Sequence, residues 1–183
     1  MTGRSLSKGH KVSAEAVRKE GGFSRDVIAT AGDCAAMAEM LGIPKVSAAK
    51  AAFSLVIVDG GSIRVTGRVQ ADLTRICVVS LEEMAENLDC SVEVVFREPV
   101  EIDARDADDE DDLLTGDEPE ALENGEIDLM RVLYEGIAVE MDPYPRRPEA
   151  EFDGLSADAG PDGGETRPDH PFAALEALKN REK

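Results

Sequence analysis

Tryptophan is absent from this chain of 183 residues, and aromatic side chains make up only 4% of it. Apolar residues nevertheless reach 42%, so the chain can bury a core, and that core must be largely aliphatic. No apolar run approaches the roughly 18 to 20 residues that a membrane-spanning helix requires. The basic, polar N-terminus also lacks the apolar stretch of a secretory signal. We therefore expect one domain with tails, located in the cytoplasm.

Cysteine and histidine, which often act as nucleophiles, bases or metal ligands, are also few. The three cysteines, Cys34, Cys77 and Cys90, form no C-x-x-C pair, and their odd number suits reduced thiols better than a disulfide framework. The histidines, His10 and His170, have no serine, cysteine or metal-ligand companion nearby in sequence. No phosphate-loop, dinucleotide-binding, nucleophile-elbow or zinc-protease motif occurs. We therefore expect no enzyme, no metal site and no cofactor, and we interpret all three cysteines as small buried hydrophobic residues.

Negative charge is concentrated in the second half of the chain. The formal net charge is −19; residues 1–102 hold 12 Lys/Arg and 14 Asp/Glu, whereas residues 103–183 hold 8 and 25. Residues 101–126 alone contain thirteen acids and one base. This distribution argues against broad binding to nucleic-acid phosphates, which needs clustered Lys and Arg, and it permits a basic protein as partner. Because the acidic segment cannot bury enough apolar surface to offset the entropy of ordering, we expect a flexible loop.

Alternating apolar residues predict an antiparallel sheet. Residues 23–29 have the composition of a strand, and two longer apolar runs are joined by Asp59-Gly60-Gly61. After that turn, every second residue from Ile63 to Leu73 is apolar or glycine, and the residues between them are polar. A third alternating run spans residues 88–96. Three consecutive strands with short connections predict a meander with one face toward water.

Helical patterns flank these strands. Residues 32–44 contain Asp33 as a predicted N-cap and end at Gly42 and Pro44. Residues 127–141 place an apolar stripe at spacings of three and four, and the following Asp-Pro pair ends it. Residues 171–183 could form a short helix at the C-terminus, which is too short to be stable unless it docks on its own domain or on a partner.

The chain therefore divides into four predicted parts. Residues 1–22 are a disordered basic tail, and residues 23–148 are a single α+β domain that contains the flexible acidic loop at about 101–126. Residues 149–170 are a flexible linker, and residues 171–183 are the C-terminal helix. The predicted architecture is an antiparallel meander, which could close into a barrel, with two or three helices.

Five motifs, in their order along the chain, resemble the YceD family, also called DUF177. They are "FSRDV", "VTGRVQADLTRICVVSLEE", the acidic stretch, "EIDLMRVLYEGIAVEMDPYP" and a terminal "PFAALEALK". The resemblance implies a bacterial, non-enzymatic factor that supports accumulation of large-subunit ribosomal RNA. Many relatives carry two cysteines at a C-x-x-C-like spacing at the end of the central strand. Here that turn has only Cys77, and one thiol is not half of a zinc site, so the resemblance does not extend to a metal.

The loop acids are the first candidates for partner binding. A calcium loop requires alternating ligands and a turn glycine, and this run has neither. These carboxylates therefore form either a solvated loop or a surface that attracts a basic ribosomal protein or the pre-ribosomal large subunit. They are Asp108, Asp109, Glu110, Asp111 and Asp112. Capture of a basic ribosomal protein is our leading hypothesis.

Two further sets of residues carry the alternatives. Arg64, Arg68 and Arg75 would form a basic strip for ribosomal RNA on the strand face, or would simply face water. Phe172, Leu175 and Leu178 would either cap the core of their own domain or enter a groove on a partner. A thiol- or metal-dependent enzyme built around Cys77 is a third, distinct hypothesis.

Overall fold

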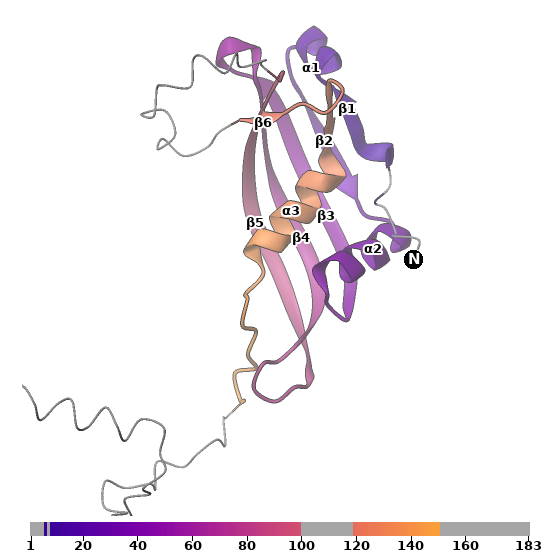
Figure 1. Cartoon of the computed structure of the whole chain (residues 1–183), viewed down its shortest axis with the longest axis vertical. Helices are drawn as coiled ribbons and strands as arrows, with labels where there is room; N and C mark the ends of the chain where they lie inside the picture. Colours follow the sequence, from indigo (N-terminus) through magenta and orange to yellow (C-terminus); the bar gives the residue numbers. More distant parts are fainter. Residues whose placement is uncertain (1–5, 7, 100–118, 151–183) are drawn as a thin grey trace, which may run out of the picture. The chain divides into compact units, whose positions relative to one another are not determined.

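The computed structural model describes residue 6 and residues 8–99 and 119–150. Its elements, in chain order, are η1 (Lys8–His10), β1 (Lys11–Ser13), α1 (Ala14–Glu20), β2 (Phe23–Ile28), α2 (Ala31–Leu41), β3 (Lys45–Ile57), η2 (Asp59–Gly61), β4 (Ile63–Ile76), β5 (Glu83–Arg97), β6 (Glu120–Ala121), β7 (Glu126–Asp128) and α3 (Leu129–Glu140). Figure 1 shows long, twisted strands with α3 running diagonally across them.

A five-stranded sheet with the order β2-β3-β4-β5-β6 forms the centre of the fold. The first four strands pair antiparallel in sequence order, and the two-residue β6 pairs parallel with the end of β5. The predicted α+β class and meander are therefore confirmed. The sheet stays open and does not close into a barrel, because β2 and β6 are its outer strands and do not pair with each other.

The tight connection between β3 and β4 sets the register of these two antiparallel strands. Gly60 and Gly61 adopt φ values of 70° and 75°, a left-handed conformation that glycine reaches without steric cost. The turn brings Ile57 opposite Ile63, and from there the alternate residues of β4 up to Leu73 face the core, except that Gly67 is only half-buried. A one-residue slip would turn every one of these side chains toward water.

The helix α3 lies on the core face of the sheet, with its apolar stripe as predicted. Leu129, Met130, Leu133 and Ile137 are fully buried, and each such side chain contributes roughly 1.5–3 kcal/mol of burial free energy. A Cβ atom placed on Gly136 would lie 2.7 Å from Val92 Cγ1, so the glycine allows α3 to approach β5 closely.

The N-terminus of α2 differs slightly from the prediction. The N-cap is Thr30, not Asp33: the Thr30 hydroxyl accepts a hydrogen bond from the Asp33 backbone N–H at 3.2 Å, and the Asp33 carboxylate accepts one from the Thr30 N–H at 3.0 Å. Asp33 therefore stands at the third helical position of a capping box. Threonine and aspartate can both accept hydrogen bonds from the free backbone N–H groups of a first helical turn. The sequence alone therefore placed the N-cap three residues too late.

The prediction that residues 1–22 form a disordered tail is wrong for the part that the structure describes. Helix α1 is capped by the Ser13 hydroxyl, and β1 pairs antiparallel with β7. Val12 and Val17 are 4% and 0% exposed, so this segment belongs to the hydrophobic core. Its pairing partner lies more than 110 residues further along the chain, and no local pattern in a short polar segment could indicate that contact.

The predicted acidic loop at 101–126 is ordered at its C-terminal end. Residues 120–121 form β6, and Leu122 is buried at 4% exposure. Residues 100–118 lie outside the described residues, as do the predicted linker from residue 151 onward and the predicted helix at 171–183.

Candidate partner-binding surface

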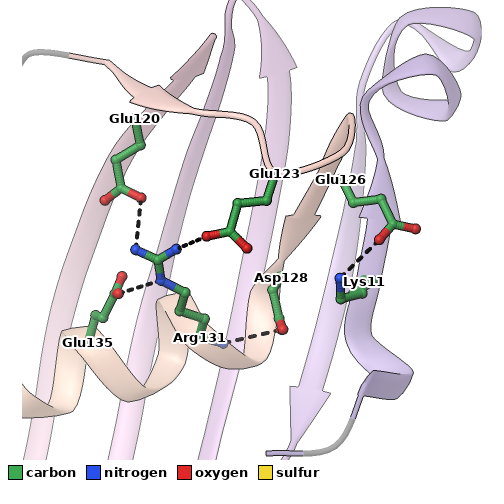
Figure 2. Close-up of polar contacts among 7 residues, drawn as sticks. All are labelled: Lys11, Glu120, Glu123, Glu126, Asp128, Arg131 and Glu135. Atoms are coloured by element: carbon green, nitrogen blue, oxygen red, sulfur yellow. Dashed lines mark hydrogen bonds and ion pairs between the residues drawn. The ribbon is translucent and has the colours of Figure 1, made fainter. Parts of the chain in front are cut away.

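An acidic cluster surrounds Arg131 on the exposed side of α3. The guanidinium Nε lies 2.6 Å from Glu135 Oε1, Nη1 lies 3.0 Å from Glu123 Oε1, and Nη2 lies 3.6 Å from Glu120 Oε2. Figure 2 shows these three carboxylates, from β6, from the turn before β7 and from α3 itself, converging on the one arginine. The hydrogen bond that Arg131 donates to Glu135 is the main reason why the pKa of Arg131 is raised. One cation is shared by three acids, so the cluster remains negative.

Two neighbouring interactions fix the cluster to the rest of the fold. Asp128 caps α3, and its Oδ1 accepts hydrogen bonds from the backbone N–H groups of Met130 at 3.1 Å and Arg131 at 3.3 Å. Glu126 on β7 pairs with Lys11 on β1 at 3.0 Å and raises the pKa of that lysine (Figure 2). The cluster and these two interactions together contain five acids and two bases, so their net charge is −3. The acids are Glu120, Glu123, Glu126, Asp128 and Glu135, and the bases are Lys11 and Arg131.

A groove of about 460 Å³ opens beside this cluster, between the edge of β5 and α3. Its floor is five consecutive β5 residues, Cys90–Val94, and its apolar wall includes Val132 and Val139. Acidic side chains also line it: Glu93, Glu120, Glu135 and Glu140. The arrangement can hold an apolar, positively charged segment.

The two predicted strand-face arginines lie together, as expected, but their charge is matched. Arg64 and Arg68 lie on the outer face of β4, where Arg64 pairs with Glu93 at 3.1 Å and Arg68 with Asp89 at 2.5 Å. Hydrogen bonds from Arg68 and then Gln70 lower the pKa of Asp89. The acids come from the neighbouring strand β5, a cross-strand pairing that the β4 sequence could not indicate.

The placement of Arg75 on the same face is wrong. Arg75 is an odd-numbered residue of β4, so it lies on the core side, where it is only 7% exposed. Its Nη1 donates to Glu86 at 2.8 Å, and its Nη2 donates to the backbone carbonyl of Asp142 at 2.8 Å. Arg75 therefore fastens β4 and β5 to the segment after α3, and it is not available to a nucleic acid.

The Cys77 thiol is buried, as predicted, and it also accepts hydrogen bonds. The backbone N–H groups of Ser80 and Arg147 each lie 3.4 Å from Sγ. The Ser80 side chain, followed by the Arg147 amide, lowers the pKa of the thiol to about 6, and burial of the sulfur opposes this only in part. Val78 N–H donates to the Pro145 carbonyl at 2.9 Å, and Arg147 pairs with Glu82 and Glu149. The turn after β4 and the proline-rich exit of α3 are thus joined around one sulfur.

The remaining predicted site residues lie outside the described residues. They are Asp108, Asp109, Glu110, Asp111, Asp112, Phe172, Leu175 and Leu178. In the part of the chain that is described, no three His, Cys, Asp or Glu side chains gather in a way that could hold a metal ion. None of the helices in that part is long and apolar enough to cross a membrane.

The family model described as "Large ribosomal RNA subunit accumulation protein YceD" matches residues 65–179, more than half of the chain. The chain belongs to the YceD family. The match runs from within β4 to a point beyond the described residues, so it includes Cys77, the acidic segment and the whole of α3. The YceD description assigns the family to accumulation of the large ribosomal RNA subunit. Neither the curated proteins nor the solved structures gave a match.

Sequence reasoning missed Arg131 as the centre of this surface. The spacing of Arg131 and Glu135, four residues apart on a helix, is a recognisable signal for one of the three contacts. The contacts with Glu120 and Glu123 depend on how the chain returns from β6 to β7, and no periodicity in that short segment predicts them.

Proposed function

We propose that this chain supports accumulation of large-subunit ribosomal RNA by binding a basic protein of the large subunit, without catalysing a reaction. The proposal combines the YceD family assignment with the charge of the described surface. Work on the large subunit would place the protein in the cytoplasm, as the sequence led us to expect.

The observation that carries the proposal is the distribution of paired charge. Arg64 and Arg68, the arginines that the sequence analysis assigned to RNA, already pair with Glu93 and Asp89. Around Arg131, in contrast, acids outnumber bases. RNA phosphates would have to displace the cross-strand carboxylates, whereas a cationic protein meets an excess of negative charge. The acidic cluster therefore suits a basic protein better than the strand-face arginines suit RNA.

The acidic segment 101–126 would contribute by long-range attraction. Four acids at or just after its C-terminal end already interact within the protein. Glu120 and Glu123 form ion pairs with Arg131, and Glu126 forms one with Lys11. Asp128 caps α3. The acids of residues 106–112 are the ones we assign to attraction of the partner. Such attraction mainly raises the association rate, and it weakens with salt because the Debye length is about 8 Å at 0.15 M.

A tagged full chain, washed at low and at high salt, tests the proposal when both protein and RNA are identified in the bound fraction. We expect the bound fraction to contain a basic large-subunit protein at low salt, and we expect high salt to remove that protein. Replacing the six acids of residues 106–112 with Ser and Asn should then slow its association by about tenfold at low salt. A variant with the six acids of residues 151–169 replaced is the matched control for net charge.

Two outcomes would contradict the proposal. One is an association rate and salt dependence that are the same in the 106–112 variant and the parent chain. The other is tight binding to ribosomal RNA fragments with a steep salt dependence that disappears in an Arg64→Ser, Arg68→Ser double variant, which would assign the activity to the strand face.

A further inference from the structure

The edge of β5 on the side away from β4 has no role in the function proposed above. β5 spans fifteen residues, but on the side away from β4 it pairs only through Phe96 and Arg97, which lie opposite the two residues of β6. Along the rest of β5, the described chain supplies no strand on that side. Figure 1 shows β6 as a short piece beside one end of this long edge strand. An unpaired edge presents a row of backbone N–H and C=O groups that can bind another strand.

The groove described above lies along this same edge. Residues 90–94 of β5 line it consecutively, and consecutive residues of a strand point to opposite faces, so the groove follows the edge of the sheet and not one of its faces. Five residues of strand extend over about 17 Å. α3 provides one side of the groove, and Val139 there is 87% exposed in the described structure. An exposed apolar side chain next to an unpaired strand edge suits a bound segment with alternate apolar residues.

We propose that the β5 edge and the adjacent side of α3 bind an extended, basic segment of a partner protein as an additional strand. The segment would continue the strand position that β6 occupies beside Phe96 and Arg97. Its backbone would pair with residues 90–94, and its apolar side chains would pack on Val92, Val94 and Val139. This inference rests on the proposed function for the nature of the partner, and it adds where and how the partner binds.

Charge selects the chemistry of this segment. The four acids of the groove, Glu93, Glu120, Glu135 and Glu140, are accompanied by two cations, Arg64 and Arg131, so the rim carries a net charge of −2. Among the described residues, Glu140 has no cationic partner. Lys and Arg at alternate positions of a bound strand would neutralise the rim, whereas an acidic segment would be repelled.

The chain's own remaining segments fit the groove less well. Residues 100–118 contain ten acids and one base, which is the wrong sign for an acidic rim. At the C-terminus, Phe172, Leu175 and Leu178 are spaced by three residues, and a strand needs apolar residues at every second position. An extended basic partner therefore suits the groove better than either segment.

A fluorescein-labelled heptapeptide of alternating Lys and Val, titrated into the full chain by anisotropy, tests the inference. We expect Val139→Ser, which removes the apolar contact without adding charge, and Glu140→Lys each to raise the dissociation constant about tenfold or more. The matched controls Ile28→Ser and Glu39→Lys make the same kinds of change at exposed positions on β2 and α2, and they should leave the constant unchanged. N-methylation of alternate peptide amides should abolish binding, because the methyl groups remove the hydrogen bonds of an added strand.

Hydrogen exchange locates the bound peptide. We expect it to slow exchange of backbone amides within residues 90–94. Binding that the groove variants do not weaken, or protection that appears elsewhere, would overturn the inference. The amides of residues 90–94 that point toward β4 are protected by that pairing, so the test uses only those that point away from it. Protection of these outward amides in the free protein would also overturn the inference. Such protection would be independent of concentration if another part of the chain fills the edge, and it would rise with concentration if a second copy does.

The two proposals can fail separately. If the chain captures a basic large-subunit protein and Val139→Ser has no effect on that capture, the proposed function stands and the edge-binding inference is wrong. If the heptapeptide binds at the β5 edge but no large-subunit protein is captured from lysate, the edge is a binding site and the proposed function is wrong.

Discussion

Cys77 ends the central strand in surroundings that favour its thiolate. Two backbone N–H groups and the Ser80 side chain point at the sulfur, and the pKa of the thiol falls from an ordinary value of 9.0 to about 6. Burial raises the pKa of Cys34 and of Cys90, so these thiols stay protonated at neutral pH. The three cysteines therefore differ in charge although all are free.

Thiolate absorbance at 240 nm should show this difference. We expect one thiol to ionise with a midpoint near pH 6 in the folded protein. The step should disappear in Cys77→Ala and persist in Cys34→Ala, because only the former removes the low-pKa thiol. A folded protein without absorbance change between pH 5 and 8 would contradict the assignment.

Stability should follow the same ionisation. The folded-state pKa of Cys77 is depressed, so the thiolate contributes to the free energy of unfolding fully above pH 9, and the contribution is lost as the pH falls toward 6. Urea titrations at pH 6, 7.5 and 9 should therefore show that the stability difference between the parent chain and Cys77→Ala grows with pH. A difference that is constant with pH would mean that only packing of the sulfur matters.

Arg75 and Arg68 offer a matched pair of ion pairs on one strand. The Arg75 side chain is 9% exposed and that of its partner Glu86 17%, whereas Arg68 is 72% exposed. Arg75→Met leaves a buried carboxylate and the Asp142 carbonyl without their donors and should cost about 3 kcal/mol in the free energy of unfolding. Arg68→Met should cost clearly less, because water screens that pair. Equal losses in denaturant titrations would show that burial is not what distinguishes them.

At the scale of elements, the position of α3 depends on one glycine. Helix interiors disfavour glycine by about 1 kcal/mol relative to alanine, yet Gly136 lies in the middle of α3. The cost is explained by the close approach to Val92 and Val69 on the sheet. A residue that is unfavourable for the isolated helix is therefore required by the packing of that helix on β4 and β5.

A larger side chain at this position should separate α3 from the sheet. We expect Gly136→Leu to lower the free energy of unfolding by about 2 kcal/mol through overpacking, despite the better helix propensity of leucine. Ala138→Leu, two residues along on the exposed side, should change it by no more than about 0.5 kcal/mol. Thermal or urea unfolding monitored by circular dichroism measures both, and a stabilised Gly136→Leu protein would show that the contact is not tight.

At the scale of the whole molecule, the two ends of the described chain stabilise each other. β1 and α1 bring Val12 and Val17 into the core, and β1 pairs with β7 immediately before α3. The same β7 carries Glu126 and leads into the Asp128 cap, so the N-terminal segment also supports the acidic cluster (Figure 2). The surface that we propose for partner binding thus depends on residues that the sequence placed in a disordered tail.

Truncating one valine should reveal this support. Val17→Ala should reduce the free energy of unfolding by about 2 kcal/mol, from lost burial and a small cavity. Val139→Ala, at an 87% exposed position, should leave it within about 0.5 kcal/mol of the parent. If Val17→Ala is as stable as the parent chain, residues 8–20 are not part of the cooperative fold.

Several features could be predicted from the sequence because they are local. The alternation from Ile63 to Leu73 identified the core face of β4, the glycine turn identified the hairpin, and the apolar stripe identified α3. The boundaries moved by a few residues where two residues could serve equally as caps, as with Thr30 and Asp33. The partner-binding residues were harder, because the acids on β5 that neutralise Arg64 and Arg68 lie more than 20 residues away along the chain.

The sequence by itself determined the α+β class, the aliphatic core and the excess of negative charge, since periodicity and composition report directly on burial and on charge. Only the tertiary structure decided that Arg75 faces inward, that the N-terminal segment pairs with β7 and that Arg131 gathers three carboxylates. It also decided that, among the described residues, β5 pairs on its outer side with β6 alone. Each of these depends on contacts between residues far apart in the chain, where register and chain reversal, and not local pattern, determine which side chains meet.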